Sequence, residues 1–195
     1  MFSKPNQNRK LPGSYRPISL LSNIDKLYEK ILLKRLNDHC YNNNIIPDEQ
    51  FGFRDKHSCT HQLLRVTNKI VEAFNVKHYT GGVFLDARNV FGRMWHKGFI
   101  VKLIKYQFPD YLFKIIQRFL SNRKFHVKIN QAFSSVGNIQ AGTLQGSSLS
   151  PSLYNIFNSD FPRNEKSLIA SLPMTQPSSH RVAISDLLLK RSNPN

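Results

Sequence analysis

Acidic residues are scarce in this sequence. Of its 195 residues, 12 are Asp or Glu and 28 are Lys or Arg, which gives a formal net charge of +16. An excess of this size favours a polyanionic partner, and nucleic acid is the commonest one. An anionic membrane surface is the competing partner, but no long basic amphipathic helix stands out in the sequence.

Cysteine and long apolar runs are also scarce. Cys40 and Cys59 alone cannot form a disulfide framework, and they suit a reducing compartment. His57 and His61 flank Cys59, but their spacing with Cys40 matches none of the usual zinc-ligand patterns. No apolar run is long enough to cross a bilayer, and residues 1–15 contain no apolar signal-peptide core. These absences predict a soluble intracellular protein without a membrane partner.

The apolar residues that are present suffice for a folded core. Hydrophobic residues make up 40% of the chain and aromatic residues 11%, which argues against global disorder. The length suits one sizeable domain, or one domain with an appendage. Pro5 and Pro12 interrupt the polar, basic start of the chain, so we expect residues 1–14 to form a flexible extended arm.

Helical spacing of apolar residues recurs along the chain. Ser22 followed by Asp25 predicts a helix start, and the Asn-rich run before Pro47 predicts its end. Further helices are predicted over residues 61–75, 97–106 and 110–120, and beyond Leu149. The residues expected to face inward are Ile24, Leu27, Tyr28, Ile31, Leu32 and Leu36 in the first helix, Leu63, Val66, Ile70 and Phe74 in the second, and Leu149, Leu153, Ile156 and Phe157 in the last.

Two segments have the pattern of strands. Val83, Phe84 and Leu85 form a short apolar run that ends at Asp86, which is typical of a strand buried on both faces. Residues 124–129 alternate between apolar and basic side chains, as in a half-buried strand with a basic outer face. Helices and strands that mix without a regular βαβ period predict an α+β fold.

Three features of the sequence are candidates for chemistry. Asp86 at the end of a buried strand could hold a divalent metal, although a carboxylate there more often only caps a turn. The loop from Gly142 to Ser147 could bring its backbone close to a ligand, although such a loop is more often only a turn. Basic residues also lie among aromatic ones, so that cations could neutralise phosphates while rings stack on bases. These residues are Tyr15, Arg16, Phe51, Phe53, Arg54, Arg123, Lys124 and Phe125.

Five segments, in order, resemble the reverse transcriptase of non-LTR retrotransposons, and most of all the jockey-type elements of arthropods. They are SYRPISLLSNIDKLYEKILLKRL, IIPDEQFGFRDKHSCTHQ, FLDARNVFGRMWH, FLSNRKFHVKIN and AGTLQGSSLSPSLYNIF, and the resemblance spans about residues 13–169. A group II intron type of reverse transcriptase is the alternative family, but the spacing F-x-D-x-x-x-x-F-x-x-x-W-H is more like that of jockey elements.

The resemblance implies an incomplete right-hand polymerase, with a fingers portion over residues 15–80 and a palm portion over residues 81–171. Met1 falls within the fingers and no thumb follows, so the resemblance also predicts truncation at both ends. It places the protein in the nucleus or in a cytoplasmic ribonucleoprotein. The partners that it implies are an RNA template, a DNA primer and deoxynucleoside triphosphates.

The family performs nucleotidyl transfer with two Mg²⁺ ions that three aspartates hold. By resemblance, Asp86 matches the first aspartate and is the expected metal ligand. Phe91 matches the aromatic residue that screens the sugar 2′ position, and Arg54 matches a fingers residue that contacts the incoming triphosphate. Gln145 and Gly146 match the P-Q-G loop, which supports the template and the incoming base. The residues expected to contact nucleic acid are Arg16, Arg123 and Lys124.

Several residues depart from the family pattern. The family's A-F-D is Val90, Phe91 and Gly92 here, and its G-V-P-Q-G-S-V-L-G-P-L-L is GTLQGSSLSPSL. The changes of Asp to Gly, Pro to Leu, Gly to Ser and Leu to Ser are each reachable by one base change, as in a drifting copy. We therefore expect disturbed geometry in the loop and disturbed packing of the helix that follows it.

The segment ASLPMTQPSS, residues 170–179, stands where the family has a hairpin with its other two aspartates, F-A-D-D. If one base is lost from a plausible coding sequence for F-A-D-D-T-A-I-L, the shifted frame encodes Leu172 to Ser179. Adjacent Asp codons read one base later give Met or Thr and then Ile, Met or Thr, as at Met174 and Thr175. We therefore expect a frameshift near Ser171 and a disordered out-of-frame tail over residues 172–195. A divergent loop or a misjudged splice junction are the alternatives.

The loss of these aspartates predicts a loss of catalysis. Met174 and Thr175 cannot anchor Mg²⁺, which requires hard oxygen ligands. Asp160 precedes the hairpin and Asp186 lies in the tail, so neither is expected to replace a missing aspartate. Pro173 further predicts an incomplete palm sheet. We expect a chain without polymerase activity, which is either a non-catalytic basic RNA binder or a non-functional translated relic.

Overall fold

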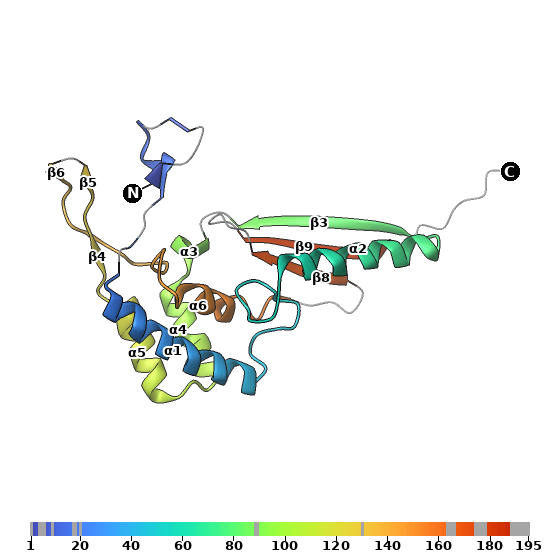
Figure 1. Ribbon diagram of the computed structural model, residues 1–195, viewed down its shortest axis with the longest axis horizontal. Coiled ribbons are helices and arrows are strands. Elements are labelled where there is room, and N and C mark those ends of the chain that lie inside the picture. The colour runs from blue at the N-terminus through green and yellow to red at the C-terminus, as the bar shows by residue number, and fades with distance from the viewer. Residues whose placement is uncertain are drawn as a thin grey trace. The chain divides into compact units, whose positions relative to one another are not determined.

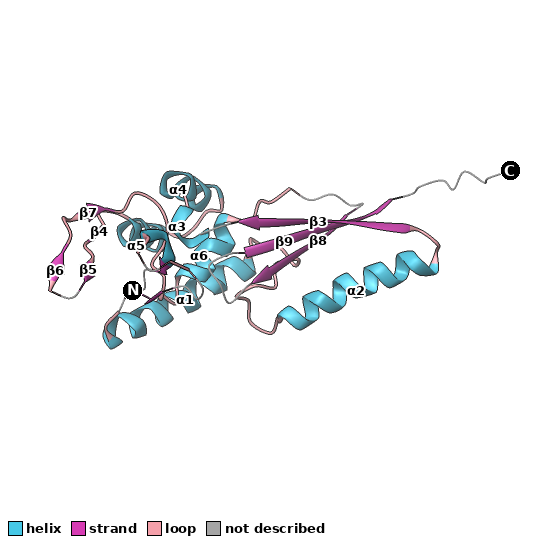
Figure 2. Ribbon diagram, turned by 90° about the horizontal axis from the view of Figure 1, so that it is seen from above, coloured by secondary structure: helices cyan, strands magenta, loops and turns pink. Residues whose placement is uncertain are grey.

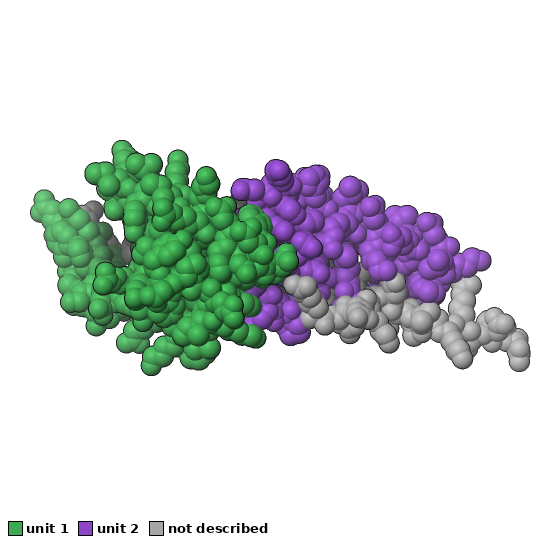
Figure 3. All heavy atoms as spheres, turned by 90° about the horizontal axis from the view of Figure 1, so that it is seen from below, with its two compact units in different colours: residues 1–45, 91–157 green, residues 46–90, 158–195 purple. Residues whose placement is uncertain are grey.

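The structure is a computed structural model that mixes helices and strands, as the α+β expectation requires (Figure 1). It describes residues 2–3, 7–8, 10–16, 19, 21–87, 90–129, 131–162, 167–173 and 179–187. The chain divides into two compact units (Figure 3). We name residues 1–45 and 91–157 the helical unit, and residues 46–90 and 158–195 the sheet unit. The fingers and palm segments have other boundaries and stay a prediction.

The helices of the helical unit are largely those that the sequence predicts (Figure 2). They are α1 (Asn23–Asn42), α4 (His96–Lys105), α5 (Asp110–Leu120) and α6 (Ser150–Phe157), with the short α3 (Val90–Arg93) before α4. The predicted start of α1 is confirmed, since the Ser22 hydroxyl accepts a hydrogen bond from the Asp25 amide at 3.1 Å. No helix among the described residues is long and apolar enough to cross a membrane.

The core of the helical unit comes from one face of each helix. Leu36, Phe99, Leu112 and Leu153 are buried there, and Leu149 and Ile156 confirm the inward face predicted for α6. The face predicted for α1 is only partly right. Leu32 and Leu36 are buried together with Glu29 and Cys40, whereas Ile24, Leu27, Tyr28 and Ile31 are exposed. Apolar residues lie on two sides of this helix, and periodicity alone does not say which side meets the core.

Short antiparallel strand pairs form in two segments where the sequence predicted an extended arm and one continuous strand. Within the predicted arm, β1 (Phe2–Ser3) pairs with β2 (Tyr15–Arg16). The predicted strand over residues 124–129 is two short strands, β4 (Lys124–Phe125) with β7 (Gly137–Asn138), and β5 (Lys128–Ile129) with β6 (Ala132–Phe133). Phe125, which was expected to face inward, is half exposed.

The sheet unit contains three antiparallel strands in the order β3, β9, β8 (Figure 2). They are β3 (Tyr79–Ala87), β8 (Ser167–Pro173) and β9 (Ser179–Leu187). Helix α2 (Cys59–Asn75) lies against β8 and β3, where Val66 packs on the fully buried Ala170. A parallel bridge between Gln50 and Ser171 ties the loop before α2 to β8.

Part of the segment that was expected to be a disordered tail forms strands in the sheet unit. Residues 172–173 and 179–187 lie in strands, so a disordered tail does not describe them, and β9 is the central strand. Pro173 is the last residue of β8, an edge strand, and edge strands are among the few places in a sheet where proline is tolerated. Met174 and Thr175, the positions of the expected paired aspartates, fall outside the described residues.

Several apolar residues of the sheet unit that were predicted to be buried are exposed. In β3, Val83, Phe84 and Leu85 are exposed, and Phe84 is 72% exposed. Successive side chains of a strand point to opposite faces, so this part of β3 is exposed on both faces of the sheet. In α2, Leu63 and Phe74 are exposed, while Gln62 and Ala73 are the buried side chains. The expected strand was correct in place, but its burial on both faces was wrong.

The central position of β9 makes the sheet sensitive to proline. Val182 pairs with Phe84 on one side and with Ala170 on the other. We expect Val182→Pro to remove a ladder hydrogen bond and to destabilise the sheet unit by about 3 kcal/mol or more. Hydrogen exchange of the β3 amides measures this effect, and Val182→Thr, which keeps the N–H, is the control. Unchanged protection of β3 in Val182→Pro would show that β9 does not hold the sheet together.

Candidate active site

The loop between Gly142 and Ser150 is the best-formed part of the predicted site. The Gly142 amide donates to the carbonyl oxygen of Met94 at 2.8 Å, and the Thr143 amide donates to that of Phe91 at 2.6 Å. The carbonyl oxygen of Gln145 accepts from the Ser19 amide at 2.8 Å. Hydrogen bonds to distant segments therefore fix the part of the loop that precedes Gly146.

Two positions that depart from the family pattern bond to each other. Ser150 stands where the family has glycine and Leu144 where it has proline, and the Ser150 hydroxyl donates to the Leu144 carbonyl oxygen at 2.8 Å. The expected disturbance of the loop is therefore absent from its hydrogen bonds. A smaller defect remains at Thr143, whose buried hydroxyl finds no hydrogen-bond partner among the described residues. Such a group destabilises a protein by roughly 1–3 kcal/mol.

The conformation of the loop requires glycine at residue 142. Gly142 has φ +84°, and a Cβ there would lie 2.5 Å from the Phe91 carbonyl oxygen and 2.7 Å from the Gly92 Cα. His96 Nε2 and Arg123 donate to the Gly142 carbonyl oxygen at 2.7 Å and 3.2 Å. The backbone of Gly142 thus joins α3, the start of α4 and the base of the β4–β7 ladder.

Phe91 lies next to this loop. Its carbonyl oxygen holds Thr143, and its ring lies 5.6 Å from the ring of Tyr154 in α6. Phe91, Gln145 and Gly146 are therefore brought together in the helical unit. Gly146 also has a positive φ of +107°, which favours glycine.

The three residues predicted to contact nucleic acid differ in their surroundings. Arg123 is half buried, desolvation lowers its pKa, and its guanidinium donates to Gly142, so it supports the loop from within. Lys124 is exposed in β4. Arg16 lies in β2 opposite Phe2, and its side chain is outside the described part of the structure.

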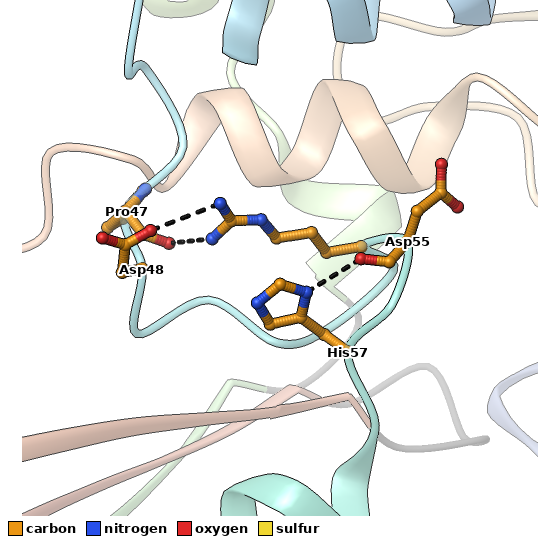
Figure 4. A network of polar contacts seen from close by, with 5 residues as sticks. Pro47, Asp48, Asp55 and His57 are labelled. Atoms are coloured by element: carbon orange, nitrogen blue, oxygen red, sulfur yellow. Dashed lines mark hydrogen bonds and ion pairs between the residues drawn. The ribbon is translucent and has the colours of Figure 1, made fainter.

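Arg54 belongs to the sheet unit, in the loop between Ile46 and α2. Its side chain is 13% exposed and donates to the Pro47 carbonyl oxygen at 3.1 Å and to Asp48 Oδ1 at 3.3 Å (Figure 4). His57 Nδ1 lies 2.8 Å from the Asp55 carbonyl oxygen in the same loop (Figure 4). In this structure the Arg54 guanidinium holds its own loop in place, and its predicted contact with a triphosphate stays a prediction.

Asp86 lies near the end of β3, where the sequence places it. Its register partner is His180 in the central strand β9, and His180 in turn pairs with Leu172 in β8. Asp186 pairs with Thr80, six residues along β9 from His180, and this separation corresponds to roughly 20 Å along a strand. Asp186 therefore lies too far along the sheet to complete a metal site with Asp86.

The donor atoms do not fit the two-metal centre of the family. Magnesium requires hard oxygen ligands, and Met174 and Thr175, the positions expected for the paired aspartates, carry a thioether and a hydroxyl. The described residues contain no group of three or more His, Cys, Asp or Glu side chains that could hold a metal ion. Burial raises the pKa of Cys40 to about 12, so its thiol stays protonated and is a poor ligand.

Three residues of the loop's surroundings were missed by the sequence analysis. Glu29 accepts hydrogen bonds from the Ser147 hydroxyl and the Ser148 amide, and His96 supports Gly142. The helical spacing of Glu29 with Leu32 and Leu36 was a signal that it faces inward. Nothing local marked Ser147 or His96, because their partners are distant in the sequence.

Comparison with known proteins identifies the family of this chain. The family described as reverse transcriptase (RNA-dependent DNA polymerase) matches residues 3–172. The chain belongs to the reverse transcriptase family. This reverse transcriptase chain is 42% identical over 162 residues to the probable RNA-directed DNA polymerase from transposon BS of Drosophila melanogaster, covering 83% of this chain and 18% of that protein.

Two further relatives support the jockey-like resemblance. The RNA-directed DNA polymerase from mobile element jockey of Drosophila melanogaster is 44% identical over 149 residues, which cover 76% of this chain and 16% of the relative. The probable RNA-directed DNA polymerase from transposon X-element of the same species is 39% identical over 168 residues, which cover 86% and 18%. The reverse transcriptase chain thus spans about a fifth of the length of these relatives or less.

The geometry of Gly142 gives a direct test of the loop. We expect Gly142→Ala to lower the free energy of unfolding by about 2 kcal/mol or more, because the new Cβ meets backbone and φ is left-handed. Gly13→Ala is the control, since a Cβ there meets nothing within 4 Å. Urea unfolding of both variants measures the difference. Equal midpoints would mean that the loop does not keep this conformation in solution.

Proposed function

We propose that this chain is a nucleic-acid-binding reverse transcriptase remnant without polymerase activity. The observation that carries this proposal is the contrast between the glycine loop and the expected set of metal ligands. The loop with Gln145 and Gly146 keeps its hydrogen bonds, while the expected ligand set for the metals keeps only Asp86. Polymerisation requires that set, whereas binding of a strand requires only cations and stacking surfaces.

The absence of catalysis follows from the metal chemistry of the family. Bound Mg²⁺ would neutralise charge on the triphosphate and activate the primer hydroxyl. A single carboxylate at Asp86, with Met174 and Thr175 at the other two positions, leaves too few hard ligands for two such ions.

The hairpin formed by β4 to β7 supports the binding of nucleic acid. The chain has no acidic residue between Asp110 and Asp160, so no carboxylate of this segment opposes phosphate. Phe133 is 61% exposed, the Lys128 Nζ lies 5.2 Å from its ring centroid, and the His126 ring lies 5.4 Å away. An exposed ring bordered by a lysine ammonium group and an imidazole ring suits stacking on an unpaired base beside its phosphate.

The base of the hairpin is held by ring packing and by a backbone hydrogen bond. Phe125 lies opposite Gly137 in the ladder, and a Cβ on Gly137 would come within 2.6 Å of the Phe125 ring. The Ile139 amide donates to the Arg123 carbonyl oxygen at 2.8 Å. The ring of Phe125 therefore covers the glycine, which leaves Phe133 as the more exposed of the two aromatic side chains.

Salt-dependent RNA binding tests this function. We expect the chain to bind a labelled single-stranded RNA with an affinity that falls as salt rises, because bound Lys and Arg displace counterions. Phe133→Ala should weaken binding by about tenfold through the loss of a stacked base. Phe74→Ala is the matched control, since this ring is 71% exposed on α2 of the sheet unit and leaves the hairpin intact.

The same preparation tests the absence of catalysis. A primer annealed to an RNA template, with all four deoxynucleotides and either Mg²⁺ or Mn²⁺, should not be extended. Template-dependent extension would overturn the proposal of an inactive chain. Equal losses of RNA affinity in Phe133→Ala and Phe74→Ala would instead remove the hairpin from the binding surface.

We further infer that the paired aspartates were lost through a frameshift near Ser171. Two points support it: the family match ends at residue 172 of 195, and a plausible coding sequence for F-A-D-D-T-A-I-L, read one base later, encodes Leu172 to Ser179. The strands β8 and β9 are compatible with this origin, because a ladder is held by backbone groups that every reading frame supplies except at proline.

The frameshift is tested at the nucleic-acid level. We expect that the locus and its transcript, sequenced across the codons for residues 165–195, encode F-A-D-D once a single base is inserted. The result that contradicts the frameshift is that neither alternative frame encodes adjacent aspartates. If the base is already present in the locus, this sequence contains an error and the corresponding protein keeps the metal ligands.

A further inference from the structure

Glu29 is a buried carboxylate to which the proposed function assigns no role. It lies on the inward face of α1 and is 4% exposed. Its Oε1 accepts a hydrogen bond from the Ser147 hydroxyl at 2.6 Å, and its Oε2 accepts one from the Ser148 amide at 2.7 Å. A buried charge without partners would be strongly destabilising, so these two donors are the reason that the carboxylate can lie here.

The hydrogen bonds of Glu29 end directly beside the centre of the loop. Ser147 and Ser148 are the two residues that follow Gly146, the glycine with φ +107°. The Ser147 hydroxyl also accepts from the Leu149 amide at 3.1 Å, so the network continues toward the start of α6. Glu29 thus fixes the backbone immediately after Gly146.

The other side of the loop centre is fixed independently. The Gln145 carbonyl oxygen accepts from the Ser19 amide, and the Gly142 backbone is held by Met94 and His96. Gln145 and Gly146 therefore lie between two anchored segments. Removal of one anchor frees one side of the centre while the other side keeps its hydrogen bonds.

A purely structural role for Glu29 is the competing explanation. Ser147 by itself already caps the Leu149 amide, and a local side chain of this kind is enough to satisfy a helix start. Glu29 adds a charged acceptor from a helix 118 residues away in the sequence, with one oxygen on each of two successive residues. This bidentate contact restricts the direction of the chain as well as satisfying donors.

We propose that Glu29 is a positioning residue, which holds Gln145 and Gly146 in the conformation that contacts nucleic acid. It acts through Ser147 and Ser148 and does not touch the bound strand. The inference rests on the proposed binding function for its consequence, whereas the fixing of the loop can be measured without any ligand.

The test compares Glu29→Gln with Glu72→Gln. Both variants remove one negative charge, but Glu72 lies on the exposed side of α2, near Lys69 at 3.9 Å. The glutamine at residue 29 keeps the shape of the side chain and loses one of its two acceptors. We expect the amides of residues 144–149 to exchange about tenfold faster in Glu29→Gln, and the affinity for single-stranded RNA to fall about fivefold. Glu72→Gln should change neither quantity in this direction.

Ser147→Ala gives a second route if Glu29→Gln fails to fold. It removes the hydroxyl that bonds to Glu29 Oε1 while leaving the carboxylate its bond from Ser148. The affinity losses of the single variants and of Glu29→Gln with Ser147→Ala should not add, because both act on one contact. All measurements are made well below the unfolding midpoint of each variant, so that global unfolding does not contribute.

Each result decides between the two roles. Faster exchange with unchanged RNA affinity would show a merely structural carboxylate and overturn the inference. Unchanged exchange would overturn it as well, whatever the affinity does. If the unmodified chain does not bind RNA, the proposed function is wrong, and Glu29 then has no effect on RNA binding to explain. The exchange rates then still report whether Glu29 fixes the loop.

Discussion

The carbonyl oxygen of Gly142 accepts hydrogen bonds from His96 and Arg123, and the arrangement of the helical unit depends on this one backbone group. The same residue donates to Met94, and its neighbour Thr143 donates to Phe91. Three separate segments thus meet at a residue that can carry no side chain, because the space of its Cβ is filled by backbone. Any substitution in this region must preserve the close backbone contacts of Gly142. The side chains of the loop can therefore diverge while its backbone keeps the same conformation.

Divergence of the loop is absorbed by side chains, while its backbone contacts persist. The Ser150 hydroxyl bonds to the Leu144 carbonyl oxygen, although both residues differ from the family pattern. Thr143 shows the opposite outcome, since its buried hydroxyl lacks a partner in the described part of the chain. Losses of roughly 1 kcal/mol are large beside the total stability of a domain, so a copy free to drift approaches its limit after a few such changes.

The sheet unit illustrates a different kind of tolerance. A β-ladder uses backbone groups, so β9 pairs with β3 on one side and with β8 on the other whatever side chains it carries. Metal binding has no such freedom, because it requires carboxylates at fixed positions. The loss of carboxylates that we propose would therefore leave the ladder of the sheet unit in place.

The sequence by itself determined the features that depend on neighbours along the chain. The capping of α1 by Ser22 and Asp25, the start of α5 at Asp110, the strand that leads to Asp86 and the family motifs are of this kind. Only the tertiary structure decided which apolar face is buried, as at Ile24 and Phe84, because burial depends on which elements meet. It also decided the partners of Glu29, His96 and Arg123, since hydrogen bonds between residues that are 118, 46 and 19 positions apart leave no local pattern in the sequence.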